Sequence, residues 1–275
     1  EITKGSDNPY RIALIPFQGE SSVAKQANEI VKNDLIRTGE FYIFDEKSLI
    51  AYPRSEDDIN YSDWRLIKAD YLLLTSVIES NSGIEARYEI FDVRKKSKIR
   101  SSKVYGVTNN VRQLSHYVSD GIYEAITGIQ GVASTKILYV SQINDLDASY
   151  RLYVADADGA NEQLLVKSPE PIISPAWSPD SKKVAYVSFE TGIANVYIQD
   201  ISTGQRQSII KKRCLTCIPN EQISSPSWSP DGKYLSLTLY QDGNAEIYIY
   251  NLQKRNLTRL TNHYSIDTES KWSPD

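Results

Sequence analysis

The chain is 275 residues long, with 31 Lys and Arg against 35 Asp and Glu and a formal net charge of −4. This length predicts two domains, and a hydrophobic fraction of 40% is enough to fill two cores. The charges are interspersed without a basic stripe, so binding to nucleic acid is not expected. No apolar run is long enough to span a bilayer.

The first residue is Glu1 and the chain contains no Met, which is expected of a protein that has lost a leader sequence and been exported. The cysteines, Cys214 and Cys217, form a single Cys-x-x-Cys pair. One such pair cannot supply four metal ligands, and its surroundings predict a loop without catalytic function. The basic runs at residues 94–96 and 211–213 are interpreted as solvated loop charge.

Residues 10–127 alternate between strand and helix signals. Short apolar or alternating runs predict strands over residues 10–16, 41–44, 70–79, 84–93 and 99–107. Between the first two, Ser21 and Ser22 open a predicted helix and Gly39 ends it. The apolar positions on one face of this helix are Val23, Ala27, Ile30, Val31 and Leu35.

Two further helices are predicted in this half of the chain. Asp63 is expected to cap a short helix through Lys68, with Trp64 and Ile67 facing inward. A closing helix follows Asn109 or Asn110, and its apolar stripe consists of Val111, Leu114, Val118, Ile122, Ala125 and Ile126. Because the strands over residues 70–107 form a meander, the sheet is expected to be mixed. The predicted organisation is an N-terminal arm (1–9) and an α/β domain (10–130).

From Lys136 onward the helical period disappears, and residues 131–275 are predicted to be a β-propeller. The tetrapeptide Trp-Ser-Pro-Asp occurs at residues 177–180, 228–231 and 272–275, in steps of 51 and 44 residues. Each unit is interpreted as strand, strand, polar turn and strand, then a connection that ends in the tetrapeptide. Because the third copy ends the chain, about three repeat units and an incomplete array are expected.

The tetrapeptide has a physical interpretation as a buried anchor followed by a forced turn. The Trp is expected to wedge between neighbouring blades, with its indole N–H needing one acceptor. Pro presets φ for the first central turn position, Asp can bond the backbone two residues on, and Gly232 supplies a positive φ. These residues are therefore predicted to be structural.

Signatures of catalysis are missing from the sequence. It contains no Gly-x-Ser-x-Gly elbow, no Walker loop and no Gly-x-Gly-x-x-Gly after a strand. Ser115 and His116 are neighbours on a helix and do not face each other, so they are not a dyad signal. Asp156 to Gly159 resembles the start of a calcium loop, but Lys167 stands where the twelfth-position glutamate is required, so a β-turn is predicted. The chain is therefore predicted not to be an enzyme and to bind no cofactor or metal.

The sequence resembles the TolB family, the periplasmic component of the Tol-Pal system of Gram-negative bacteria. The resemblance is carried by Ser168–Asp180 with Lys183–Glu190, and by Asp156–Gly159. In the first half it is carried by Ile15–Phe17, Asp34-Leu35, Gly39–Phe41 and Leu114–Gly131. It implies an α/β domain followed by a six-bladed, WD40-like propeller that this chain contains only in part.

The resemblance also implies a function. TolB-like proteins are non-enzymatic scaffolds that bind the peptidoglycan-associated lipoprotein Pal at the propeller mouth and TolA through the N-terminus. They support outer-membrane integrity, envelope constriction at cell division and protein import, and the resemblance also implies other outer-membrane or peptidoglycan-associated partners. The alternatives are a propeller-bearing peptidase fragment, which the missing elbow argues against, and a propeller that senses a small ligand.

Repeat register selects candidate partner-binding residues. The positions three and four before each repeated Trp are expected to share one face, in loops that precede the motif. With the neighbouring Gln222, the candidates for Pal binding are Ile173, Ser174, Gln222, Ser224, Ser225, Thr268 and Glu269. The candidates for TolA binding, as a strand-addition arm, are Glu1, Ile2, Thr3 and Lys4.

Overall fold

The computed structural model describes residues 8–19, 22–81, 83–107, 110–143, 149–209, 222–241 and 243–274. The chain divides into two compact units, Glu1–Thr135 and Lys136–Asp275. The domain limits that the sequence suggests, at residues 9 and 130, stay predictions. Cys214 and Cys217 lie outside the described residues.

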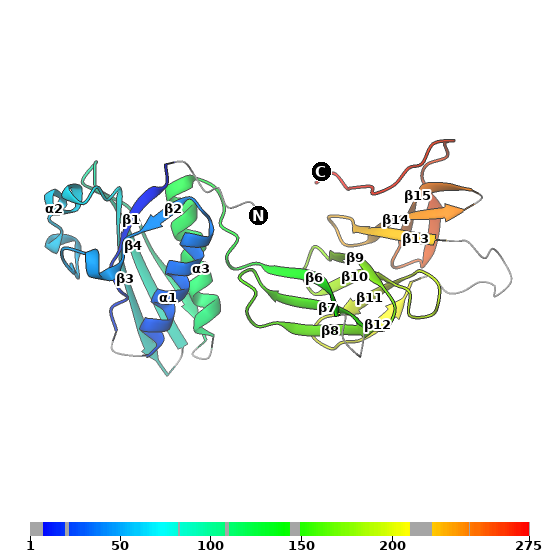
Figure 1. Ribbon diagram of the computed structural model, residues 1–275, viewed down its shortest axis with the longest axis horizontal. Helices are drawn as coiled ribbons and strands as arrows, with labels where there is room; N and C mark the ends of the chain where they lie inside the picture. Colours follow the sequence, from blue (N-terminus) through cyan, green and yellow to red (C-terminus); the bar gives the residue numbers. More distant parts are fainter. Residues whose placement is uncertain are drawn as a thin grey trace. The chain divides into compact units, whose positions relative to one another are not determined.

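The first unit is built on a five-stranded sheet in the order β2-β1-β3-β4-β5 (Figure 1). β1 pairs in parallel with both β2 and β3, whereas β3, β4 and β5 form an antiparallel meander. The sheet is therefore mixed, as predicted. The strand bounds are Tyr10–Leu14 (β1), Phe41–Ile43 (β2), Tyr71–Ser80 (β3), Gly83–Asp92 (β4) and Ser97–Gly106 (β5).

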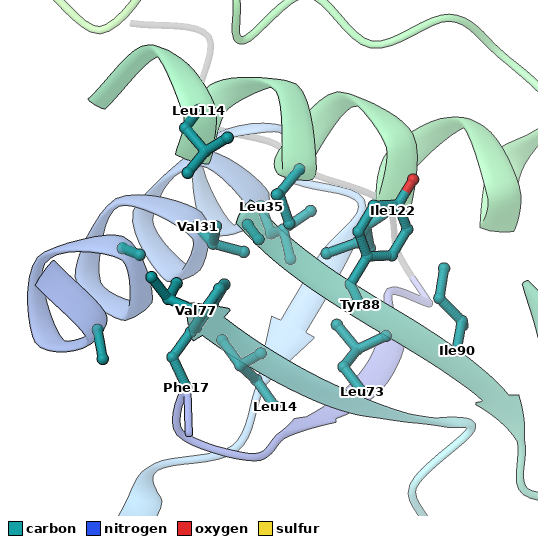
Figure 2. Packing of buried hydrophobic residues seen from close by; sticks show 14 of the residues in the cluster. Leu14, Phe17, Val31, Leu35, Leu73, Val77, Tyr88, Ile90, Leu114 and Ile122 are labelled. Carbon is teal, nitrogen blue, oxygen red and sulfur yellow. The ribbon is translucent and has the colours of Figure 1, made fainter. Parts of the chain in front are cut away.

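Two long helices, α1 (Ser22–Arg37) and α3 (Val111–Thr127), cover one face of this sheet (Figure 1). Asn110 caps α3 by accepting the N–H of Gln113, and Gly128 ends it in the left-handed conformation. The apolar stripes of the two helices meet side chains of β3 and β4 in one core (Figure 2). Its buried members include Val31, Leu35, Leu73, Val77, Tyr88, Leu114, Val118 and Ile122.

The other face of the sheet is covered by the short helices η1 (Glu46–Ser48), η2 (Glu56–Asp58) and α2 (Tyr61–Leu66). Trp64 is 1% exposed there and packs in a second core with Phe91 and Val93. The predicted cap of α2 is wrong: Asn60, not Asp63, accepts the N–H of Ser62. Asn60 occupies the N-cap position, two residues before the N–H that it accepts. The helix therefore begins at Tyr61, and Asp63 lies inside it.

The second unit consists of antiparallel sheets that follow one another along the chain. The first contains β6 (Lys136–Ile143), β7 (Ser149–Asp156) and β8 (Gln163–Ser168). The second contains β9 (Ile172–Trp177), β10 (Lys183–Ser188), β11 (Asn195–Asp200) and β12 (Arg206–Ser208). The third contains β13 (Gln222–Trp228), β14 (Tyr234–Gln241), β15 (Asn244–Asn251) and β16 (Asn256–Arg259). The predicted fold class, an α/β domain followed by propeller-type sheets, is confirmed.

Neighbouring sheets of the second unit share hydrophobic cores. Leu152 and Val166 of the first sheet join Tyr186 of the second, with Trp177 packed against them. Val187 of the second sheet joins Leu237 of the third, with Trp228 packed against that cluster. Trp177 and Trp228 thus lie where two sheets meet, and burial of such large side chains holds the sheets together.

One expectation about the repeat is wrong. The segments before Trp177 and Trp228 were expected to be connecting loops, but they are β9 and β13, which pair with β10 and β14. Pro175 and Pro226 within these segments argue against a strand in sequence. Both prolines are tolerated because each lies where the register of the strand shifts at a bulge. None of the helices in the described ranges is long and apolar enough to cross a membrane.

Candidate functional site

The same backbone irregularity precedes each copy of the repeated motif. Ser174, Ser225 and Glu269 each stand three residues before a repeated Trp, and their φ angles are 51°, 52° and 54°. Left-handed backbone is uncommon for residues other than glycine and costs of the order of 1–2 kcal/mol per residue. Its recurrence at one register position in three repeats is therefore a built feature of the second unit.

In β9 and β13 this residue belongs to a β-bulge. The register of β9 against β10 shifts between Ala185 and Val187, and that of β13 against β14 shifts between Ser224 and Ser227. A bulge inserts an extra residue and re-aims the side chains beside it. The candidate residues before the first two copies of the motif thus belong to bulged edge strands of the second and third sheets.

The third copy has the same backbone turn without a strand. Glu269 donates its N–H to Thr238 Oγ1 at 3.3 Å, and the hydroxyls of Thr238 and Thr268 lie 3.4 Å apart. Asp267 donates its N–H to the carbonyl of Ala245 at 2.9 Å. Thr238 is 5% exposed, so a buried hydroxyl of β14 holds the segment that carries Thr268 and Glu269.

The candidate residues differ in exposure. Ile173, Thr268 and Glu269 are exposed, whereas Ser174, Ser224 and Ser225 are half-buried. The backbone of Gln222 pairs with Tyr240, but its side chain lies outside the described residues. The TolA candidates, Glu1, Ile2, Thr3 and Lys4, also lie outside the described residues.

A buried carboxylate anchors the chain that leads to the third copy. Glu246 is 2% exposed, and its Oε1 accepts Arg259 Nη2 at 3.0 Å and the N–H of His263 at 2.8 Å. Thr261 Oγ1 donates to Oε2, and this hydrogen bond contributes most to the lowered pKa of Glu246. The position of β11 that corresponds to Glu246 of β15 is Asn195. The buried carboxylate therefore occurs in the third sheet and not in the second. Sequence reasoning missed Glu246, because an acid that opens a predicted strand is usually at the surface.

The Trp-Ser-Pro-Asp turns lie at the other end of the sheets. The N–H of Ser181 donates to the carbonyl of Ser178 at 2.9 Å, and Asp180 Oδ1 accepts the N–H of Lys182 at 3.1 Å. Ser229 and Asp231 repeat these contacts with Gly232 and Lys233. The predicted turn chemistry, in which Asp bonds the backbone two residues on, is confirmed.

The turn hydroxyls are part of the same network. Ser178 Oγ and Ser229 Oγ each donate to the following Asp Oδ1 at 2.6 Å. These hydrogen bonds hold the pKa of Asp180 and of Asp231 below the ordinary value for aspartate. Carboxylates that are already occupied in this way stabilise a turn and leave little capacity for a ligand.

The indole N–H groups behave differently from copy to copy. Trp272 donates Nε1–H to the carbonyl of Ser227 at 3.0 Å, the acceptor that the motif was expected to need. Its ring stacks on Tyr234 with centroids 6.3 Å apart. Trp228 Nε1 is buried without a partner among the described residues.

A polar cluster that sequence reasoning missed lies between α1 and α3. Asp34 Oδ2 is 2.7 Å from His116 Nδ1 and accepts Ser119 Oγ at 2.8 Å, while Arg37 Nη2 donates to Oδ1 at 2.7 Å. All of Asp34, His116 and Ser119 are at most 3% exposed. The signal was available, since these residues fall on the apolar faces of two predicted helices.

This cluster does not have the geometry of a nucleophilic relay. Ser119 donates to the carboxylate and not to the imidazole, whereas a nucleophilic serine is hydrogen-bonded to its histidine. Ser115 donates to the carbonyl of Val111 within its own helix, so the prediction that Ser115 and His116 form no dyad is confirmed. The cluster therefore acts as a buried polar contact between two helices.

Candidate metal ligands were compared within each unit, over the described residues. Taken one unit at a time, the described residues contain no three His, Cys, Asp or Glu ligand atoms close enough to share an ion. At the start of the segment 156–159, for which a β-turn is predicted, Asp156 accepts Lys136 Nζ at 2.7 Å and Asn161 Nδ2 at 2.6 Å. Gly159 donates its N–H to the carbonyl of Asp156 at 2.8 Å, which confirms the β-turn.

Two family models match the chain. The model described as the TolB amino-terminal domain matches residues 1–99. The model described as the TolB beta propeller domain matches residues 123–275, which is more than half of the chain. The two matches follow the same order as the two structural units.

Individual relatives agree with these models. The Tol-Pal system protein TolB of Alcanivorax borkumensis is 40% identical over 88% of this chain and 55% of its own length. That of Hahella chejuensis is 41% identical over 76% of this chain and 50% of its own length. The crystal structure of TolB from Acinetobacter baumannii matches with a TM-score of 0.86 and 37% identity, covering 100% of this chain and 66% of that one. The chain thus spans about half the length of the curated relatives it matches.

Proposed function

This chain belongs to the TolB family, and from that premise we propose that it acts as a non-enzymatic scaffold of a Tol-Pal cell-envelope system. In this proposal it works in the periplasm and binds protein partners with its surfaces. Its relatives carry the name Tol-Pal system protein, which supports membership of that system. Support of outer-membrane integrity and of envelope constriction at cell division belongs to the same proposal.

The observation that carries the proposal is the left-handed residue that recurs before each repeated Trp. Ser174, Ser225 and Glu269 keep a backbone that costs free energy at one position of three repeats. The neighbouring strands pair without such a bulge, because β10 with β11 and β14 with β15 keep an unbroken register. Presentation of side chains to a partner is a reason to retain such a strained position.

We propose that the Pal-binding surface includes Ile173, Ser174, Gln222, Ser224, Ser225, Thr268 and Glu269. These residues share one end of their sheets, since β9 begins opposite Ser188 and β13 begins opposite Tyr240. The surface combines an exposed apolar residue, small hydroxyls and one carboxylate. Such a mixture suits a protein interface with an apolar centre and a polar rim.

The test measures the affinity of the 275-residue chain for Pal by titration calorimetry. Glu269→Lys reverses a charge and Ser225→Arg adds bulk, and each is expected to weaken binding by about tenfold or more. Lys254→Glu is the matched control, because Lys254 is an exposed residue in the β15–β16 turn at the opposite end of the third sheet. If both surface variants bind Pal with wild-type affinity, the proposed surface is wrong.

Folding of the variants needs its own check. Glu269→Gly removes the side chain at a position where glycine fits the φ of 54° without strain, so the fold is expected to be kept or stabilised. Loss of Pal binding together with an unchanged or raised unfolding midpoint would assign the effect to the side chain. Retained Pal binding by Glu269→Gly would show that only the backbone at this position contributes, and would remove the Glu269 side chain from the proposed surface.

We propose that TolA binds the first residues, Glu1, Ile2, Thr3 and Lys4, by strand addition. The motivation is the family membership and the position of this segment ahead of the first strand. Deletion of residues 1–6 is expected to abolish TolA binding and to leave Pal binding unchanged. An unchanged affinity for TolA after the deletion would dispose of the arm.

A further inference from the structure

A pocket of ≈ 540 Å³ opens in the first unit, where β1 and β3 begin and β4 ends. Two of its cations, Arg94 and Lys95, come from the basic run that was interpreted as plain loop charge. The charged side chains that line it are Arg11, Lys68, Arg94, Lys95, Asp70 and Asp92. Four cations therefore surround two carboxylates in a chain whose overall net charge is negative.

Both carboxylates of the pocket are already occupied. Asp70 Oδ2 accepts the N–H of Arg11 at 3.0 Å, and its Oδ1 accepts Arg94 Nη2 at 2.8 Å. Asp92 Oδ1 accepts the N–H of Lys95 at 2.8 Å, and its Oδ2 lies 3.6 Å from Lys95 Nζ. Arg94 and Lys95 thus balance the two acids, and the charges of Arg11 and Lys68 are left over.

Lys68 has no carboxylate within ion-pair distance among the described residues. It is exposed and follows α2 with a φ of 61°, at the position after a helix where glycine is preferred. A lysine in this place keeps a strained backbone and a free ammonium group at the rim of the pocket.

Arg11 is only partly satisfied. Its guanidinium carbon lies 5.4 Å from the ring centroid of Tyr42 and 5.1 Å from that of Phe44, and Nη2 donates to the carbonyl of Ile67 at 3.3 Å. Its Nε is buried and has no acceptor in the described residues. The guanidinium of Arg11 thus has no carboxylate partner of its own although the residue lines the pocket, and carboxylates match a guanidinium in geometry and charge.

We propose that this pocket binds an acidic peptide segment of a protein partner through its carboxylate side chains. A peptide is favoured over a small anion because the walls also carry Tyr10 and Tyr71, whose rings meet edge-on with centroids 5.8 Å apart. Tyrosine and arginine are the residue types that dominate the binding energy of protein interfaces. The site lies in the first unit and does not depend on the proposed Pal surface in the second.

The experiment uses the full chain and fluorescence anisotropy of two labelled peptides. One peptide alternates Asp with Ser and Gly, and the other replaces every Asp with Asn. The acidic peptide is expected to bind with an affinity that falls as salt is raised, and the neutral peptide is expected not to bind. Equal binding of the two peptides would overturn the proposal.

Lys68→Glu is the decisive variant, and Lys96→Glu is its matched control. Both are exposed lysines with positive φ, 61° and 56°. Lys96 follows Arg94 and Lys95 in the basic run but does not line the pocket. Lys68→Glu is expected to weaken the acidic peptide by at least about tenfold, and Lys96→Glu by less than about twofold. Equal losses would mean that the peptide senses only the net charge of the region, and would overturn the pocket.

Two further measurements distinguish loss of the ammonium group from misfolding, and a bound peptide from a bound free anion. Lys68→Gly is expected to raise the unfolding midpoint while weakening the peptide, and misfolding cannot produce that combination. Retained peptide affinity in Lys68→Gly would overturn the role of the ammonium group. Inorganic phosphate is the competitor: displacement of the peptide at phosphate concentrations below the peptide's own dissociation constant would overturn the peptide in favour of a free anion.

Discussion

The hydroxyl oxygen of Tyr88 lies 2.0 Å from the point that a Cβ atom on Gly121 would occupy. Tyr88 rises from β4 into the core under α3, and Figure 2 shows its ring directed at that helix. Glycine inside a helix is unfavourable by roughly 1 kcal/mol relative to alanine. At this position it is required, because α3 approaches the sheet so closely that no side chain fits.

Gly121→Ala is therefore expected to destabilise the first unit, although alanine is the better helix former. Overpacking of this kind costs typically about 1–3 kcal/mol, measured as a loss in the free energy of unfolding. Tyr88→Phe removes the nearest atom and should restore part of the loss. The rescue is partial because the ring carbon behind the hydroxyl would still lie 2.9 Å from the added methyl group. A double variant no more stable than Gly121→Ala would contradict the contact.

Ser181 and Gly232 occupy the same place after two copies of the repeated turn, with φ angles of 57° and 70°. Serine pays for a left-handed backbone that glycine adopts freely. Ser181→Gly is expected to stabilise the second unit by about 1 kcal/mol in urea unfolding, and Gly232→Ser to destabilise it by a similar amount. Ser181→Ala keeps the strain and serves as the control. A destabilised Ser181→Gly would show that the serine side chain matters more than the strain.

His116 is expected to matter more than its neighbour Ser115, although both are 1% exposed. His116→Ala leaves the buried carboxylate of Asp34 with one hydrogen-bond partner fewer, and losing a hydrogen bond to a charged group costs about 1.5–3 kcal/mol. Ser115→Ala removes only a hydroxyl that bonds its own helix, at a cost of about 1 kcal/mol or less. Chemical denaturation of both variants measures the difference. Equal costs would mean that the buried pair contributes nothing beyond packing.

Asp200 gives a prediction about acid. Hydrogen bonds from Ser202 and Thr203 lower its pKa to about 2, from 3.8. Because the pKa is lower in the folded chain, the stabilisation is fully present above pH 3.8 and is lost as the pH falls toward 2. Asp200→Asn cannot titrate, so its free energy of unfolding should fall less steeply than that of the wild type across this window. Parallel curves for the two proteins would refute the assignment.

Glu246 gives a prediction about the segment that carries the third candidate position. Glu246→Ala removes the acceptor of the N–H of His263, the hydroxyl of Thr261 and one N–H of Arg259. Amide exchange of His263 is then expected to accelerate by at least about tenfold, as loss of a hydrogen bond to a charged group implies. The N–H of Asp200, which donates to the carbonyl of Gln205 in the β11–β12 turn, is the internal control and should not change. Unchanged exchange at His263 would show that the segment is held by other contacts.

Much of the first unit follows from periodicity in the chain. The stripe that includes Leu114 and Val118 predicts α3 and its buried face, because side chains three and four apart share one side of a helix. The cap of α2 was missed because Asp63 and Asn60 are both good caps, and which one is used depends on where Trp64 packs. The strands β9 and β13 were missed because a bulge and a proline destroy the alternation on which strand prediction relies.

Local chemistry and repetition already indicate the two kinds of architecture and the turns after Trp177 and Trp228, because these depend on residues close together in the chain, and the family resemblance is carried by similarly short stretches. Pairings between distant residues needed the tertiary structure. Asp34 meets His116 across 82 positions, and Thr238 reaches the N–H of Glu269 across 31. No pattern in the sequence measures such distances, since they are set by how helices and sheets pack around a shared core. The tertiary structure also decided that Gly121 lies directly against Tyr88 and that Lys68 lies at the rim of a basic pocket.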